Sequence, residues 1–160
     1  MRIFSFLMVI SITAGLASGQ NKDAKEPLSI VIIVETPVVK AGSGVSVDGR
    51  LTNTSNKPLD ASGCYCGPSG LDSYLTWEVR DGKGRMVAKK IYPHPELATS
   101  SAILDRIINP GESIAGSQDI SRLFDMSRPG KYVVQASRRI SFGKDSGVVK
   151  SNKVTVTVIR

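Results

Sequence analysis

Short segments in which hydrophobic and polar residues alternate recur along this 160-residue chain. Strict alternation places every second side chain on the same face of a β-strand, so each segment predicts a strand with one buried face. The alternation is clearest at residues 45–52, 75–80 and 154–158. These segments predict a fold built mainly from half-buried strands, with Val47 and Trp77 facing the core.

Two further segments are hydrophobic without simple alternation. Residues 28–34 are apolar on both faces, which predicts a strand that is either covered on both sides or switches from one sheet to another. Glu35 and Pro37 end this segment and guard it against edge-to-edge aggregation. Residues 102–108 suit one face of a helix, but their isoleucines favour a strand, and we assign a strand.

Turn residues separate these segments. Asp81-Gly82-Lys83-Gly84 predicts a tight hairpin with residues 85–88 as the returning strand, because such a turn needs positive φ angles. Asn109-Pro110-Gly111-Glu112 has proline and glycine in the order of a type II turn. Asp119 is a capping residue, and it predicts one short helical turn over residues 120–124.

A third turn, Arg128-Pro129-Gly130-Lys131, leads into a clearly alternating strand over residues 132–140. Tyr132 lies at the start of this strand, where immunoglobulin-like sandwiches place a tyrosine whose hydroxyl bonds back to the preceding chain. Val134 and Val47 occupy the positions at which antibody domains carry their bridging cysteines. We therefore expect both valines and Tyr132 in a core that is held together by packing alone.

The order of four motifs along the chain resembles bacterial extracytoplasmic immunoglobulin-like domains and, in layout, the intracellular proteinase inhibitor family. The motifs are residues 51–59, residues 77–84, residues 109–113 and Pro129-Gly130-Lys131-Tyr132. The resemblance covers about residues 28–159 and implies an all-β, antiparallel immunoglobulin-like β-sandwich of about 7–9 strands. It identifies no inhibitory residue, because no reactive-site motif of that family is present.

The N-terminus has the pattern of an export signal. A positive end is followed by an apolar run at residues 3–16 and by small residues suited to a signal peptidase. We expect a signal peptide over residues 1–19 with cleavage before Gln20, a flexible lead-in over residues 20–27, and one domain over residues 28–160. The apolar run is too short for a membrane span, so we expect a secreted or periplasmic protein without a transmembrane segment.

The formal net charge of +7 favours attraction to anionic surfaces. Two basic doublets, Lys89-Lys90 and Arg138-Arg139, stand out in the sequence. Adjacent residues of a strand point to opposite faces, so these doublets predict solvated edges and not one nucleic-acid patch. We expect no nucleic-acid partner.

Few residues have the types and spacing that chemistry requires. His94 is the only histidine, and the carboxylates are scattered. Cys64 and Cys66 are candidates for a small, strained disulfide, but a loop staple, two separate thiols or an intermolecular bridge are alternatives. We expect no metal site, no cofactor and no enzymatic activity.

These observations predict an exported, non-catalytic domain that binds a protein or an envelope component through loops and edge strands. The alternative is a protease inhibitor that acts through a loop from Lys89 to Pro95, which prolines hold in an extended form. A thiol oxidoreductase or another secreted enzyme is a third hypothesis. The residues of the candidate interaction loop are Tyr92, Pro93, His94 and Pro95.

Overall fold

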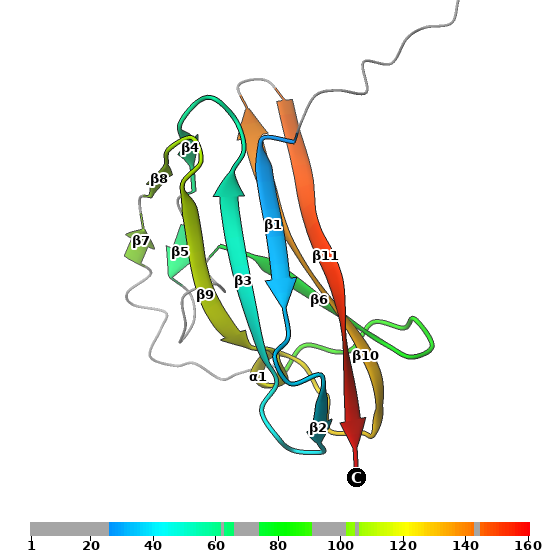
Figure 1. The fold of residues 1–160 in the computed structure, drawn as a ribbon. Coiled ribbons are helices and arrows are strands. Elements are labelled where there is room, and N and C mark those ends of the chain that lie inside the picture. Colours follow the sequence, from blue (N-terminus) through cyan, green and yellow to red (C-terminus); the bar gives the residue numbers. More distant parts are fainter. Residues whose placement is uncertain (1–25, 62, 66–73, 91–101, 105, 143–144) are drawn as a thin grey trace, which may run out of the picture.

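The computed structural model describes residues 26–160 apart from residues 62, 66–73, 91–101, 105 and 143–144. The predicted signal peptide, residues 1–19, lies outside the described residues, as does most of the predicted lead-in. The described chain contains eleven strands and one short helix, and its long strands form two layers (Figure 1). The protein is an all-β sandwich, as the alternation of its sequence predicts.

Each layer is one sheet. The first has the order β1 (Leu28–Ile33), β3 (Ser46–Asn53) and β9 (Ser113–Asp119). The second has the order β2 (Val38–Lys40), β11 (Asp145–Ile159), β10 (Gly130–Phe142) and β6 (Thr76–Asp81). Its ladders are antiparallel except that between β2 and β11, which is parallel. The topology is immunoglobulin-like, and apart from the ladder at β2 it is the antiparallel sandwich that the sequence predicts.

The parallel ladder arises because the chain changes sheets after β1. Three inward side chains of β1, namely Leu28, Ile30 and Ile32, are buried. On its outer face Val31 and Ile33 are 47% and 59% exposed. The chain therefore changes sheets between β1 and β2, and β1 itself stays in one sheet. Among the described residues no third layer lies over β1, so the expectation of a strand covered on both faces is wrong.

Short ladders raise the number of strands above the predicted 7–9. β4 (Leu59–Asp60) pairs with β8 (Ile107–Ile108), and β5 (Gly63–Tyr65) pairs with β7 (Ala102–Leu104). The strand predicted over residues 102–108 is thus divided between β7 and β8, which have different partners. The strand predicted over residues 85–88 is wrong, because this segment meets β6 through a single isolated bridge, Arg80 to Met86.

The predicted turn and helix are present. Gly111 has a φ of 78°, and the backbone N–H of Glu112 donates to the carbonyl oxygen of Asn109 at 2.9 Å, as the type II turn requires. The helix α1 (Ile120–Leu123) begins after Asp119, whose carboxylate accepts a hydrogen bond from the backbone N–H of Ser121 at 3.0 Å. This cap terminates β9 and directs Ile120 into the core.

The core lies between the two sheets. Val47, Val134, Trp77 and Tyr132 are all buried. The Tyr132 hydroxyl donates to the carbonyl oxygen of Arg128 at 2.7 Å, which is the tyrosine-corner bond that the sequence predicts. This bond fixes the turn before β10, the strand that pairs with both β6 and β11.

Candidate functional site

The predicted cysteine pair and interaction loop are not described. The backbone of Cys64 belongs to β5, but its side chain and the whole of Cys66 lie outside the described residues. The loop residues Tyr92, Pro93, His94 and Pro95 lie outside them as well. The hypotheses of a disulfide and of an inhibitory loop therefore stay predictions.

An open groove lies on the outer face of the three-stranded sheet, and we call it the β1 groove. Its volume is about 450 Å³. The strands β1, β3 and β9 each contribute two or three of its residues, which are Val31, Ile33, Asp48, Gly49, Arg50, Ala115, Gly116 and Ser117. The groove thus combines an apolar side, at β1, with a polar centre.

The polar centre of the groove contains two charged side chains, Asp48 and Arg50, which differ in their hydrogen bonding. The Asp48 carboxylate accepts a hydrogen bond from the Ser117 hydroxyl across the ladder between β3 and β9. Arg50 is exposed, and within the described chain its guanidinium makes no hydrogen bond or ion pair. A guanidinium in this state is ready to bind a carboxylate from outside.

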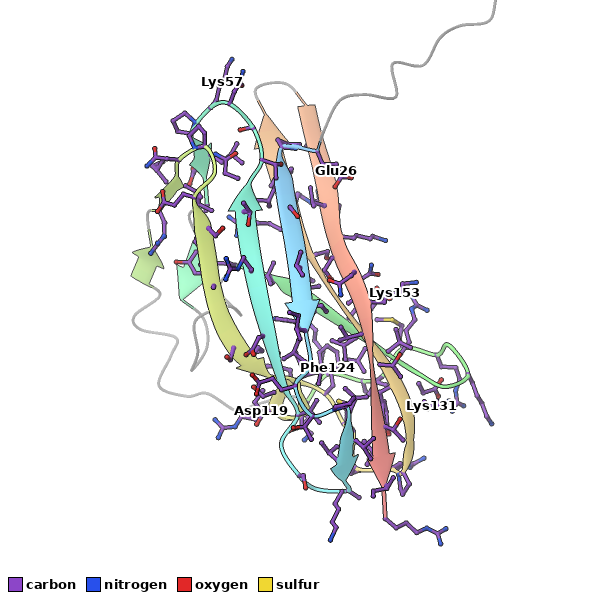
Figure 2. The ribbon with its side chains drawn as sticks, viewed as in Figure 1. Glu26, Lys57, Asp119, Phe124, Lys131 and Lys153 are labelled. Atoms are coloured by element: carbon purple, nitrogen blue, oxygen red, sulfur yellow. The ribbon has the colours of Figure 1, made fainter. Side chains whose placement is uncertain are left out.

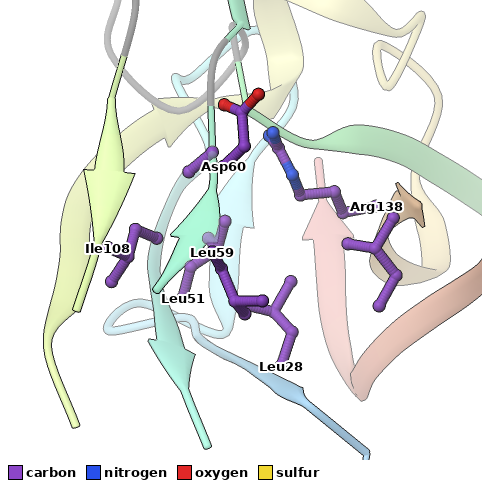
Figure 3. A pocket seen from close by; sticks show the side chains of 8 residues that line it. Leu28, Leu51, Leu59, Asp60, Ile108 and Arg138 are labelled. Atoms are coloured by element: carbon purple, nitrogen blue, oxygen red, sulfur yellow. The ribbon is translucent and has the colours of Figure 1, made fainter. Parts of the chain in front are cut away.

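A small cavity lies between β1, β3, β4, β8 and β10. Figure 3 shows its apolar lining, which includes Leu28, Leu51 and Ile108. The volume is about 30 Å³, which equals the share of liquid occupied by one water molecule. This cavity is too small to hold an organic substrate.

Arg138 and Asp60 lie at the polar end of this cavity, with the guanidinium directed toward the carboxylate (Figure 3). Arg138 Nη1 donates to the carbonyl oxygen of Tyr74 at 2.8 Å, and the guanidinium lies 5.9 Å from the centre of the Tyr74 ring. Burial lowers the pKa of Arg138, and the negative charge of Asp60 opposes that change. The expectation of solvated edges is therefore wrong for Arg138, although Arg139 is exposed.

Asn53 is a buried polar residue with a structural function. Its Nδ2 donates to the carbonyl oxygens of Lys57 and Ile108, each at 2.8 Å, and its Oδ1 accepts from the backbone N–H of Ser55 at 2.9 Å. These bonds tie the turn after β3 to β8. Asn53 is also the first residue of an Asn-Thr-Ser sequence that matches a glycosylation acceptor. These hydrogen bonds occupy its side-chain amide, the group to which a glycan would be attached.

Asn152 joins β11 of one sheet to β1 of the other through its side chain. This function of Asn152 was not predicted from the sequence. Its Oδ1 accepts from the backbone N–H of Ile32 at 2.8 Å, and its Nδ2 donates to the carbonyl oxygen of Ile32 at 2.9 Å. The side-chain amide thereby makes the two hydrogen bonds to Ile32 that a neighbouring strand would otherwise make with its backbone. It is directed there by a bulge, in which Ser151 and Asn152 of β11 together oppose Ala136 of β10.

The burial pattern along β11 reflects this bulge. The buried residues of β11 are Val149 and Ser151 before the bulge, and Val156 and Val158 after it. Buried positions change from odd to even numbers between the two halves. Such a change of phase in one long strand requires an extra residue.

The described residues contain no group of three or more His, Cys, Asp or Glu side chains that could hold a metal ion. Among them there is also no helix with the length and apolar character needed to cross a membrane.

Comparison with known proteins finds weak structural likeness alone. No protein-family model matches the chain, and no curated protein matches it. A solved structure of AggA, the major subunit of aggregative adherence fimbriae type I from Escherichia coli, is similar over 82% of this chain and 95% of that chain. The two chains are 12% identical, and the TM-score is 0.35. At these values the likeness assigns no family and no function.

Proposed function

We propose that the protein is an exported, non-catalytic domain that binds another protein through the β1 groove. The observation that carries the proposal is the exposure of Val31 and Ile33, at 47% and 59%, on an edge strand beside the unpaired guanidinium of Arg50. Exposed apolar residues on an edge strand favour self-association, and grouped apolar side chains rimmed by polar groups are typical of a protein-binding surface.

The chemistry of the groove defines the partner. Val31 and Ile33 offer an apolar surface, so the partner contributes apolar side chains. Arg50 binds a carboxylate of the partner, and arginine is enriched where protein interfaces form. The partner is therefore a protein segment in which an acidic side chain lies next to apolar ones.

Site-specific photo-crosslinking tests this proposal. A photoreactive amino acid replaces Ile33 in one variant and Val148 in the control variant, and each is irradiated with the envelope fraction of the producing cells. Val148 is a matched control because it is 51% exposed but lies on β11 in the other sheet. We expect a discrete protein adduct at Ile33 only, and Arg50→Glu should remove it. Equal labelling at both positions, or no protein adduct at Ile33, would contradict the proposal.

A further inference from the structure

The outer face of the four-stranded sheet has a chemistry different from that of the β1 groove, and we propose that it binds a linear acidic polysaccharide. Five cationic side chains, which we call the basic face, project from three adjacent strands of this sheet. They are Arg80 of β6, Lys131 and Arg139 of β10, and Lys150 and Lys153 of β11. Figure 2 shows Lys131 and Lys153 on the side of the molecule that β10 and β11 form.

The strand register places these cations in a regular array. Along β10 the outward positions from Lys131 to Arg139 form five successive rows, and each row contains one of the five cations. The cross-strand pairs that define the rows are Lys131 with Thr157, Val133 with Arg80, Gln135 with Lys153, Ser137 with Lys150, and Arg139 with Val148. Rows are about 7 Å apart, so the four intervals between five rows extend the array over about 28 Å.

The bulge in β11 completes the array. Lys150 and Lys153 are three residues apart, and in a regular strand this spacing would put them on opposite faces. Because Ser151 and Asn152 share one position of the ladder, Lys150 pairs with Ser137 and Lys153 with Gln135, and both lysines face outward. The residue that joins β1 to β11 thus lies in the same bulge that concentrates positive charge on the basic face.

Most of this charge is not neutralised by the protein. Glu78 is paired with Arg80 at 2.6 Å. Lys131, Lys150, Lys153 and Arg139 are exposed, and in the described part of the chain they form no ion pair. Four cations on one face, without internal partners, attract a ligand that carries several negative charges.

The other residues of the basic face favour a polysaccharide over other polyanions. Between the cations lie hydroxyl and amide groups, which hydrogen-bond to sugar hydroxyls; they belong to Thr76, Gln135, Ser137, Thr155 and Thr157. The five rows contain no aromatic residue on which the bases of a single strand could stack, and a flat sheet face enters neither groove of a duplex. Lysine is depleted in protein interfaces, which makes a protein ligand a poor match. An acidic glycan fits a flat, hydroxyl-rich, cationic surface.

The test measures binding of the purified protein to heparin, a sulfated linear glycan, and to polygalacturonate, a carboxylated one, at several salt concentrations. Neutral dextran, duplex DNA and anionic phospholipid vesicles serve as comparison ligands. The variant K150Q/K153Q removes two charges from the basic face. The control K57Q/K90Q removes two charges from exposed positions away from the basic face. Lys90 lies beside α1, where its Nζ donates to the carbonyl oxygen of Ser121, and Figure 2 shows Lys57 at the turn after β3. Unfolding in urea verifies that both variants are folded.

We expect binding to at least one acidic glycan at physiological salt and none to dextran. K150Q/K153Q should weaken that binding by about 30-fold, as expected for two lysines at an anionic surface. It should also reduce the slope of log affinity against log salt by about 2. K57Q/K90Q should leave both values nearly unchanged.

Three results would overturn the inference. One is an equal loss in both double variants, which would mean that only the net charge attracts the glycan. Another is tighter binding to duplex DNA or to anionic vesicles than to both glycans under the same conditions. The third is the absence of glycan binding at physiological salt. The β1 groove lies on the other sheet, so its cross-linking experiment succeeds or fails independently.

Discussion

Asn152 gives the sharpest test of how the two sheets are joined, because its side chain forms both hydrogen bonds between β11 and the edge of β1. In the variant Asn152→Ala the N–H and C=O groups of Ile32 lose these partners. One hydrogen bond contributes about 0.5–1.5 kcal/mol, and Asn152 is exposed, so water replaces part of the loss. We expect the free energy of unfolding to fall by about 1–2 kcal/mol.

Urea unfolding measures this change directly. Trp77 is the only tryptophan and is buried, so its fluorescence reports the loss of the core. The midpoint should fall without a change of slope, since the surface exposed on unfolding is the same. Hydrogen exchange should show faster exchange of the Ile32 amide than in the parent protein. The control Asn56→Ala, at an exposed turn position, should change stability by less than about 0.5 kcal/mol.

The variant Asn152→Asp separates hydrogen bonding from packing. At neutral pH the carboxylate still accepts from the Ile32 N–H, but it faces the Ile32 carbonyl oxygen without a proton to donate. Protonation in acid restores a donor at this position. The deficit relative to the parent should therefore shrink as the pH falls. If Asn152→Ala is as stable as Asn56→Ala and the Ile32 amide remains protected, the amide does not join the sheets and the reasoning is wrong.

Four further predictions concern other parts of the chain. Tyr132→Phe should lower the free energy of unfolding by about 1 kcal/mol, because the hydroxyl no longer donates to Arg128. Burial raises the pKa of Tyr132, so the parent, but not the variant, should lose stability through this residue as the pH rises above about 10. Trp77→Ala should cost about 3–5 kcal/mol in urea, and Trp77→Phe clearly less, since among the described residues the buried indole N–H has no hydrogen-bond partner to lose. The hydrogen bond from Arg85 lowers the pKa of Asp81, so Asp81→Ala should destabilise the protein at neutral pH. In strong acid the carboxyl of the parent is protonated and its stabilising effect is lost, so the variant should then be as stable as the parent. An equal loss of stability at both pH values would contradict this. Mass spectrometry of the protein from the producing cells should find Gln20 as the first residue, and a chain that retains Met1 would refute export by cleavage.

Local patterns in the sequence were sufficient to predict the strands that have one buried face. Alternation placed Trp77 on an inward position of β6, and the Pro-Gly turn before Tyr132 identified the tyrosine corner. The cap at Asp119 likewise predicted α1. These features depend on residues close in sequence, because side-chain direction and turn geometry are set within a few residues.

Such local patterns could not predict which strands pair with each other. Residues 85–88 have strand character, yet they meet β6 only through an isolated bridge, whereas the ladder of β6 is formed with the distant strand β10. The segment that became β7 and β8 was split by two different partners. Strand pairing joins residues far apart in sequence, so the alternation of one segment does not specify its neighbour.

The candidate surfaces depend on these long-range pairings. The sequence by itself determined a sandwich with an excess of positive charge and a hydrophobic first strand. Only the tertiary structure decided that Val31 and Ile33 lie outside, that Arg138 is drawn inward beside Asp60, and that Lys150 and Lys153 share a face. The physical reason is register, since one extra residue in a ladder reverses the side to which every following side chain points.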